Sequence, residues 1–144
     1  MTYLPEGLPV PNTTDSLMAP YWQATRQHAL KIQSCAGCGA WQWGPEWICH
    51  RCHSFDLVWK EVAGEGRIYS YQRIWHPVHR ALEGRGPYIA VLVELPHADN
   101  VRMIGNLLGD PRQDVRIGTS VRAVFESHDE ASPPFTLVHW RAVP

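Results

Sequence analysis

The sequence lacks an apolar run long enough to cross a bilayer, which takes about 20 consecutive apolar residues in a helix. Its start, MTYLPEGLPVPNTTDS, has neither the basic residues nor the apolar stretch of a secretory signal peptide. Lysine is scarce, since only Lys31 and Lys60 occur among 13 basic residues, and the formal net charge is −1. Neutralising phosphates supplies most non-specific affinity for nucleic acids. We therefore expect a cytoplasmic protein that spans no membrane and whose main partner is not a nucleic acid.

Catalytic motifs are also missing. The sequence contains no GxGxxG fingerprint, no Walker A loop, no GxSxG elbow and no HExxH motif. The eight histidines form no catalytic constellation that the sequence reveals, and we read His76 and His79 as surface-loop residues. We name no catalytic residue and expect that the chain is not an enzyme on its own.

The chain divides into three parts by composition. Residues 1–30 hold a proline-containing arm and then a predicted helix from about Ser16 to Leu30, with Ser16 as its cap. Residues 31–56 hold all four cysteines. Residues 57–144 alternate short β-like runs with turns that contain Gly and Pro. We expect these parts to be an arm with a helix, a metal-held segment and a barrel.

Six β-like runs make up the third part. They are Leu57–Val62, Arg67–Trp75, Tyr88–Leu95, Val101–Leu108, Ser120–Glu126 and Phe135–Trp140. Short strands without intervening helices are typical of a small antiparallel barrel or sandwich. The predicted fold class is therefore mainly β: an N-terminal helix, a four-cysteine ribbon and a five- to six-stranded antiparallel barrel of the OB type.

The four cysteines form two C-x-x-C pairs, Cys35 with Cys38 and Cys49 with Cys52, ten residues apart. Two such turns aim four sulfur atoms at one point, which suits a tetrahedral metal ion. A site closed by four thiolates leaves no position for water or substrate, so we predict a structural ion. Zinc is the expected metal and iron is the alternative, because four thiolates suit both.

Three tryptophans lie between the two cysteine pairs, at positions 41, 43 and 47. They either cover the metal segment and wedge it against its neighbour or dock a partner, because exposed aromatic residues mark interfaces. Together with two aromatic residues of the predicted helix they make up the candidate partner interface: Tyr21, Trp22, Trp41, Trp43 and Trp47.

Basic and aromatic residues gather in the run that follows Gly66. Between Gly66 and Gly86 the sequence contains a single acidic residue, Glu83, and four arginines, at positions 67, 73, 80 and 85. Strand alternation puts Tyr69, Tyr71, Arg73 and Trp75 on one face. This is either an ordinary solvated face or a contact for an anionic ligand, such as the phosphates of a nucleotide-containing cofactor.

The order of these motifs resembles the DUF35 family, bacterial and archaeal proteins that join an N-terminal rubredoxin-like zinc ribbon to an OB-fold domain. The resemblance covers nearly the whole chain. The motifs that carry it are Pro20-Tyr21-Trp22, Ile32 to Gly39, Cys49 to Cys52, Trp59 to Val62, Gly64 to Tyr71, Gly86 to Leu95 and Ile117 to Val121. None is diagnostic alone, whereas their order is specific in combination.

The resemblance implies an accessory role. Members of the family partner thiolase-like enzymes, including sterol-carrier-type thiolases, and some partner retro-aldolases that shorten the side chains of steroid CoA thioesters. Such a subunit would stabilise its partner and help form the CoA or acyl channel, and a dimeric thiolase-like partner implies an α2β2 assembly. The family's metal set maps onto Cys35, Cys38, Cys49 and Cys52.

CoA carries an adenine and phosphates, so the basic and aromatic run supplies the candidate contacts with it: Arg67, Arg73, Arg85, Tyr71 and Trp75. Two other functions stay open at this point. One is a stand-alone OB-fold binder of nucleotides or single-stranded nucleic acid. The other is a rubredoxin-like electron carrier with iron in the cysteine site.

Overall fold

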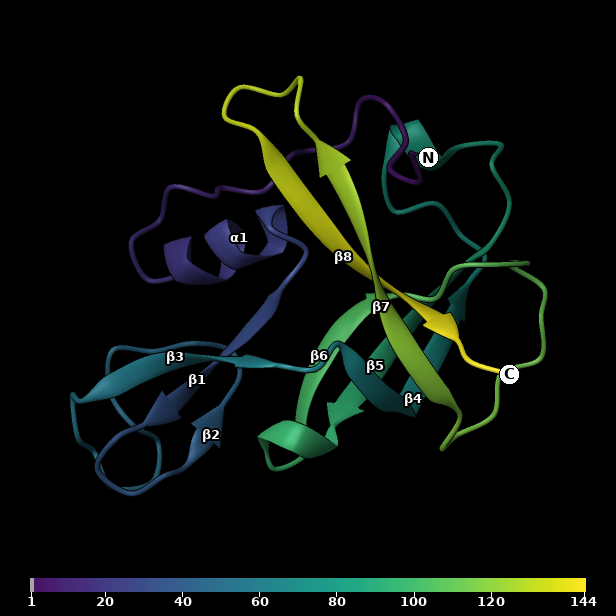
Figure 1. The fold of residues 1–144 in the computed structure, drawn as a ribbon. Coiled ribbons are helices and arrows are strands. Elements are labelled where there is room, and N and C mark those ends of the chain that lie inside the picture. The colour runs from purple at the N-terminus through teal and green to yellow at the C-terminus, as the bar shows by residue number, and fades with distance from the viewer. Residues whose placement is uncertain (1) are drawn as a thin grey trace.

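The computed structural model describes residues 2–144, which form two sheets and one α-helix (Figure 1). The elements are α1 (Ala19–Arg26), β1 (Leu30–Cys35), β2 (Trp41–Gln42), β3 (Leu57–Val62), β4 (Glu65–Ile74), η1 (Arg80–Leu82), β5 (Tyr88–Leu95), η2 (Pro96–Ala98), β6 (Val101–Asn106), β7 (Ser120–His128) and β8 (Phe135–Ala142). The predicted fold class, mainly β with one N-terminal helix, is confirmed.

Five strands form the barrel, in the order β6-β5-β4-β7-β8 with antiparallel neighbours. The two edges meet through a parallel bridge between Leu107 and Trp140. The backbone N–H of Leu108 donates to the carbonyl oxygen of Trp140 at 2.7 Å. This bridge nearly closes the sheet, and a closed sheet leaves no unpaired edge for a wrong partner.

Alternation along β5 builds the centre of the core. Ile89, Val91, Val93 and Leu95 are buried, while the residues between them are partly exposed. Trp140 of β8 is completely buried against this face. Gly105 of β6 makes room for it, because a Cβ atom there would lie 2.7 Å from Cδ1 of Trp140. The indole therefore packs directly on the backbone of β6.

The metal segment contains strands that the sequence did not predict. β1 pairs with β2 on one side and with β3 on the other. We expected residues 57–62 to be the first strand of the barrel. Instead, β3 pairs along its whole length with β1 of the small sheet. The small sheet lies beside the barrel and below α1 in Figure 1. Only Ala63 and Gly64 separate β3 from β4.

The helix is shorter than predicted. The turn before it is held by Asp15, whose side chain accepts a hydrogen bond from the N–H of Leu17 at 2.8 Å. Met18 is the N-cap and makes no side-chain capping bond, so Ser16 is not the cap. His28 has φ +56°, a conformation that turns the chain from α1 into β1. The predicted end at Leu30 was wrong, because Leu30 already pairs with Val62.

Strand positions after residue 56 follow the prediction closely. Residues 57–62 and 88–95 are strands with the predicted bounds, and the other four runs differ only at their ends. The segment between β4 and β5 carries the short turn η1. Among residues 2–144, no helix combines the length and the hydrophobicity that crossing a membrane takes.

Candidate metal centre

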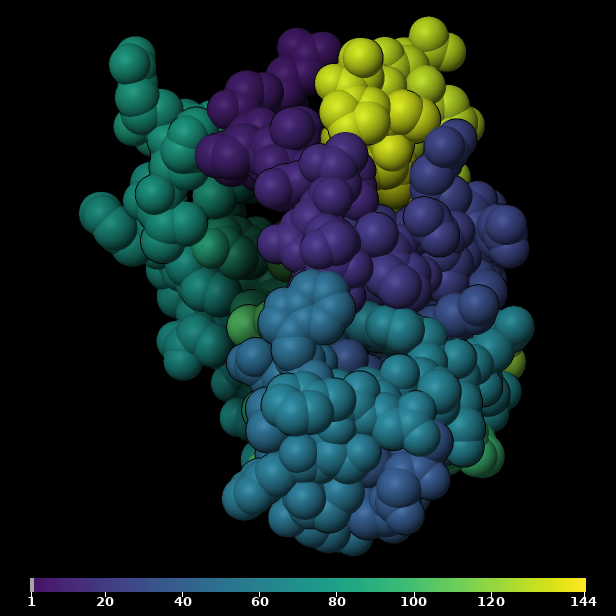
Figure 2. Space-filling view, turned by 90° about the vertical axis from the view of Figure 1, so that its left-hand side faces the viewer, coloured from purple at the N-terminus to yellow at the C-terminus, as the bar shows by residue number. Residues whose placement is uncertain are grey.

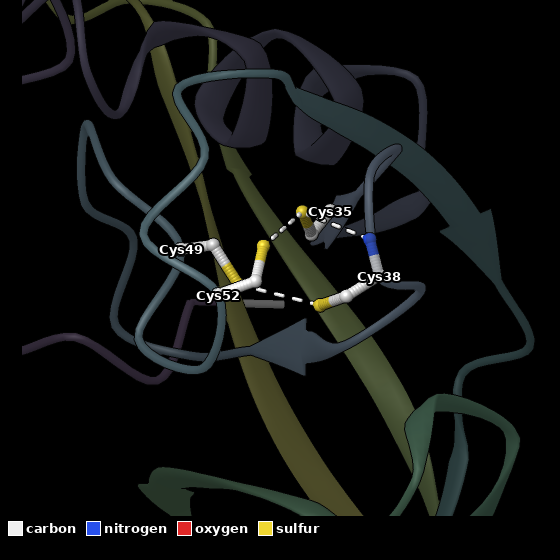
Figure 3. A group of neighbouring side chains, drawn as sticks. All are labelled: Cys35, Cys38, Cys49 and Cys52. Carbon is white, nitrogen blue, oxygen red and sulfur yellow. Dashed lines mark hydrogen bonds between the residues drawn. The ribbon is translucent and has the colours of Figure 1, made fainter.

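Two tight turns bring the four cysteines together (Figure 3). Cys35 ends β1, and Cys49 follows the loop that β2 begins. The second cysteine of each pair lies at the outer rim: Cys35 and Cys49 are buried, whereas Cys38 and Cys52 are exposed. The centre is therefore anchored at the end of the small sheet and capped on its solvent side by its own turns.

The two turns repeat the same backbone geometry. The N–H of Gly39 donates to the carbonyl of Cys35 at 2.8 Å, and the N–H of His53 donates to that of Cys49 at 3.0 Å. Both residues have positive φ, +78° for Gly39 and +63° for His53. The second turn thus needs the left-handed conformation that glycine adopts freely, yet a histidine occupies it.

The sulfur positions fit a tetrahedral ion. All four Sγ atoms lie within 4.8 Å of one another. Sγ of Cys35 lies 3.6 Å from that of Cys52, and Sγ of Cys38 lies 3.6 Å from that of Cys49. A tetrahedral zinc–sulfur bond of about 2.3 Å places neighbouring sulfur atoms about 3.8 Å apart. A disulfide needs about 2.05 Å, so these distances indicate metal ligands and not disulfides.

Backbone amides favour the thiolate form that a metal requires. The N–H of Cys52, helped by that of Arg51 at 3.4 Å, lowers the pKa of the Cys49 thiol to about 6. The N–H of Cys38 likewise lies 3.5 Å from Sγ of Cys35 and lowers the pKa of that thiol. Each turn therefore prepares its first cysteine to bind a cation.

The neighbouring histidines do not join the cysteines. Nδ1 of His50 forms a hydrogen bond with Oε1 of Gln42 at 2.9 Å, so this ring nitrogen already has a partner outside the cysteine cluster. His53 serves the backbone of the second turn and lies outside the ligand cluster. This agrees with the expectation that neither histidine replaces a cysteine.

A buried glutamine pair, which the sequence did not point to, holds the loop between the cysteine pairs. Nε2 of Gln42 donates to Oε1 of Gln33 at 2.7 Å. Gln33 also accepts from the N–H of Glu46 at 3.1 Å and donates to its carbonyl at 2.8 Å. No periodicity or motif marks these two residues. Only the pairing of β1 with β2 brings them face to face.

The candidate interface residues differ widely in exposure. Tyr21 is buried, which raises the pKa of its hydroxyl by desolvation, so it is not available to a partner. Its ring meets that of Trp43 edge-on at 4.9 Å between centroids. Trp22, Trp41 and Trp43 are partly buried and pack against the main core. Trp47 alone of the five stands out, with 62% of its surface exposed.

The predicted aromatic face of β4 is broken by a bulge. The register shifts between Ile68 and Ser70, so Tyr71 pairs with Val91. Tyr69 lies instead under the guanidinium of Arg102, 3.6 Å from the ring centroid. The prediction that Tyr69 shares a face with Tyr71 was therefore wrong, because a bulge inverts strand alternation and leaves no mark in the sequence.

The three candidate arginines are not equivalent. Arg67 pairs with Glu94 at 3.4 Å. Arg73 donates to the carbonyls of Pro111, at 3.0 Å, and Gln113, so it holds a loop in place. Arg85 is exposed, and no ion pair or side-chain hydrogen bond among residues 2–144 includes it. Two of the three candidate arginines thus already have partners within the chain.

A second polar cluster escaped sequence analysis. Glu126 is 2% exposed, and its carboxylate accepts from the N–H of Leu4 at 2.8 Å. The same carboxylate lies 2.8 Å from Nε2 of His128 and 2.7 Å from Nε2 of His139. It fastens the N-terminal arm to β7 and β8. Alternation along β7 places Glu126 on the face opposite Val121 and Ala123 of the core, so nothing in the sequence marks it as buried or names its partners.

Comparison with known proteins adds the family. A model of the rubredoxin-like zinc ribbon domain of ChsH2 matches residues 22–58, and a model of the C-terminal OB-fold domain of ChsH2 matches residues 59–126. A solved structure described as an Ltp2-ChsH2(DUF35) aldolase is similar with a TM-score of 0.76 and 35% identity. The match covers 92% of this chain and 98% of that one.

Curated relatives include proteins of other lengths. A probable enoyl-CoA hydratase alpha subunit of Thermomonospora curvata is 38% identical over 125 residues. A 3-oxo-4,17-pregnadiene-20-carboxyl-CoA hydratase alpha subunit of Mycobacterium tuberculosis is 28% identical over 147 residues. The matches cover 86% and 94% of this chain but only 37% and 43% of those two subunits.

A DUF35 domain-containing scaffold protein of Methanocaldococcus jannaschii is 26% identical over 115 residues, which are 77% of this chain and 78% of that protein. The ribbon model, the OB-fold model and the structural match thus agree along the chain. The protein belongs to the DUF35 family, whose members join a rubredoxin-like zinc ribbon to an OB-fold domain.

Proposed function

We propose that the chain is the non-catalytic accessory subunit of an enzyme that acts on CoA thioesters, with a thiolase-like protein as its partner. The observation that carries this proposal is the likeness to the Ltp2-ChsH2(DUF35) aldolase, which spans 98% of that chain. The names of the relatives agree, since two are alpha subunits of hydratases for CoA thioesters and one is a scaffold protein.

The metal centre suits a supporting role. The four cysteines would hold one zinc ion, which leaves no open position for a substrate. The ion would fasten two turns and the end of β1 to each other. Iron at this site would give a rubredoxin-like electron carrier instead, and its visible absorption separates the two metals, because zinc is colourless.

For the surface that contacts the partner we propose the exposed apolar side chains of the zinc ribbon. Trp47 and Phe55 are 62% and 79% exposed, and Ile48 between them in sequence is 38% exposed. Large exposed aromatic side chains on a rigid, metal-held scaffold are favourable anchors for a protein interface. Trp41 and Trp43, by contrast, already pack on the core of this chain.

For the CoA channel we propose Tyr71 and Trp75 as stacking surfaces and Arg112 as the phosphate contact. Tyr71 and Trp75 are 39% and 59% exposed, and the guanidinium of Arg112 lies 4.9 Å from the Trp75 ring centroid. Arg67 and Arg73 are less suitable, since a carboxylate and two carbonyls already engage them.

The test is recovery of the tagged chain from its own cells, followed by native mass spectrometry and metal analysis. A thiolase-like protein in a 1:1 ratio, with α2β2 mass and one zinc per chain, is the expected result. Trp47→Ala combined with Phe55→Ala should weaken the complex, whereas Val10→Ala, which removes an exposed residue of the arm, should not. A chain that carries zinc but recovers no such partner contradicts the proposal.

A further inference from the structure

A cavity of about 450 Å³ lies between the N-terminal arm and the barrel. The arm forms one wall with residues 3–5 and 8, and the segment from η1 to the start of β5 forms the opposite wall. Figure 2 shows this hollow between the purple arm and the teal segment. Pockets that bind small molecules span about 300–1,000 Å³, so the cavity is large enough for a ligand.

The walls are mainly apolar. Five leucines line the cavity: Leu4, Leu8, Leu82, Leu107 and Leu108. The last two are buried at the joint that closes the barrel, and the first two come from the arm. Such walls favour a hydrocarbon chain over a polar molecule.

The arm is held in place as a wall. The N–H of Leu4 donates to Glu126, and the hydroxyl of Tyr3 accepts from Arg141 at 3.1 Å. A Cβ atom on Gly7 would contact Ala81 of η1 at 3.6 Å, which places the arm against the far side of the opening. The cavity is therefore framed by hydrogen-bonded elements.

One end of the cavity is polar. His139 is 2% exposed and lines it, with Nε2 bonded to Glu126. The bond to Glu126 engages Nε2, so Nδ1 is the ring nitrogen that remains for other partners. Nδ2 of Asn106 lies 3.3 Å from Nδ1, and Asn106 also lines the cavity, so an imidazole and an amide lie together at this end.

Among the described residues that line the cavity, Arg85 alone is a Lys, Arg, Asp or Glu. It is exposed, and no ion pair between residues 2 and 144 includes it. A free guanidinium beside apolar walls favours a carboxylate, which it binds with two parallel hydrogen bonds.

We propose that this cavity binds a medium-chain carboxylate, with the carboxylate on Arg85 and the hydrocarbon chain among the leucines. The site goes beyond the proposed function, because it requires neither the partner enzyme nor CoA. Its lining includes neither Trp75 nor Arg112.

The test is a titration of the zinc-loaded full chain with octanoate, followed through its ¹H–¹⁵N NMR spectrum. Saturable shifts of the Leu4, Leu82 and Tyr88 amides are expected. Loss of the charge in Arg85→Gln should weaken octanoate binding about tenfold or more, because a charged hydrogen bond is lost. Octan-1-ol should bind both forms equally, and Arg116→Gln, which removes another exposed arginine, should change nothing.

Filling the cavity provides the second arm of the test. Leu82→Trp, and separately Leu8→Trp, should abolish binding of both ligands while the spectrum stays dispersed and zinc stays bound. Shifts that do not saturate, shifts that map elsewhere, or an unchanged octanoate affinity in Arg85→Gln would each overturn the proposal. None of these results bears on recovery of the partner enzyme, so the two proposals fail separately.

Discussion

Glu126 offers the sharpest test of how the arm and barrel are joined. Its carboxylate meets three groups, the N–H of Leu4, His128 and His139, at 2.8, 2.8 and 2.7 Å. Glu126→Gln keeps the shape but turns one oxygen into an NH₂ group, which cannot accept a hydrogen bond. Hydrogen bonds to charged groups contribute about 1.5–3 kcal/mol each, so we expect the free energy of unfolding to fall by about 2–4 kcal/mol.

The pKa of Glu126 gives this prediction a second signature. Burial opposes ionisation, but the N–H of Leu4 and the rings of His139 and His128 outweigh it, so the pKa lies below its usual range. A carboxyl group whose pKa is lowered by folding stabilises the fold above its unfolded pKa. That contribution is lost as the pH falls through the folded pKa. Wild-type protein should therefore lose more stability below about pH 4 than Glu126→Gln does.

The assay is thermal unfolding of zinc-saturated protein at pH 7 and in acid, followed by circular dichroism. About 3 °C per kcal/mol for a chain of this size predicts a drop of roughly 6–12 °C at pH 7. Glu130→Gln is the matched control, because Glu130 is exposed and belongs to no ion pair among the described residues. Any destabilisation that acid causes through loss of the metal should affect Glu130→Gln as much as the wild-type protein. If Glu126→Gln melted together with Glu130→Gln at pH 7, the cluster would contribute nothing and the reasoning would be wrong.

Three further predictions concern packing and the metal centre. Cys49→Ser should leave less than one zinc per chain by metal analysis; full occupancy would show that three thiolates suffice. Gly105→Ala should lower the free energy of unfolding by about 1–3 kcal/mol in chemical denaturation, because its Cβ atom would overlap Trp140. An unchanged denaturation midpoint would disprove this close approach. His53→Gly should raise the stability of the zinc-loaded form by up to about 1 kcal/mol, because φ is +63° there, while Gly39→His should lower it; equal effects would contradict the strain argument.

The sequence predicts the barrel well because its strands carry their own signals. β5 alternates cleanly between buried and partly exposed residues, and Gly86-Pro87 marks its start. The spacing of the cysteines likewise predicts one shared centre, and the four sulfur atoms do lie together. Both features are local, so neither depends on knowledge of the tertiary fold.

The failures share a different cause. β1 and β2 lie in a segment that we assigned wholly to the metal, and β2 is only two residues long. The bulge at Tyr69 depends on the register with β5, which no single strand encodes. The partners of Glu126 come from Leu4 and from two neighbouring strands, so only the folded chain brings them together.

The tie between Leu4 and Glu126 also implies an order of events during synthesis. The pairings of the small sheet all lie between residues 30 and 62, so this part has what it needs soon after it leaves the ribosome. The arm must wait for β7, and α1 packs against β8 as well as β1. Chains emerge N-terminus first. The arm is thus made before β7 but docks only after it, and the part of α1 that packs on β8 stays uncovered until β8 has been made.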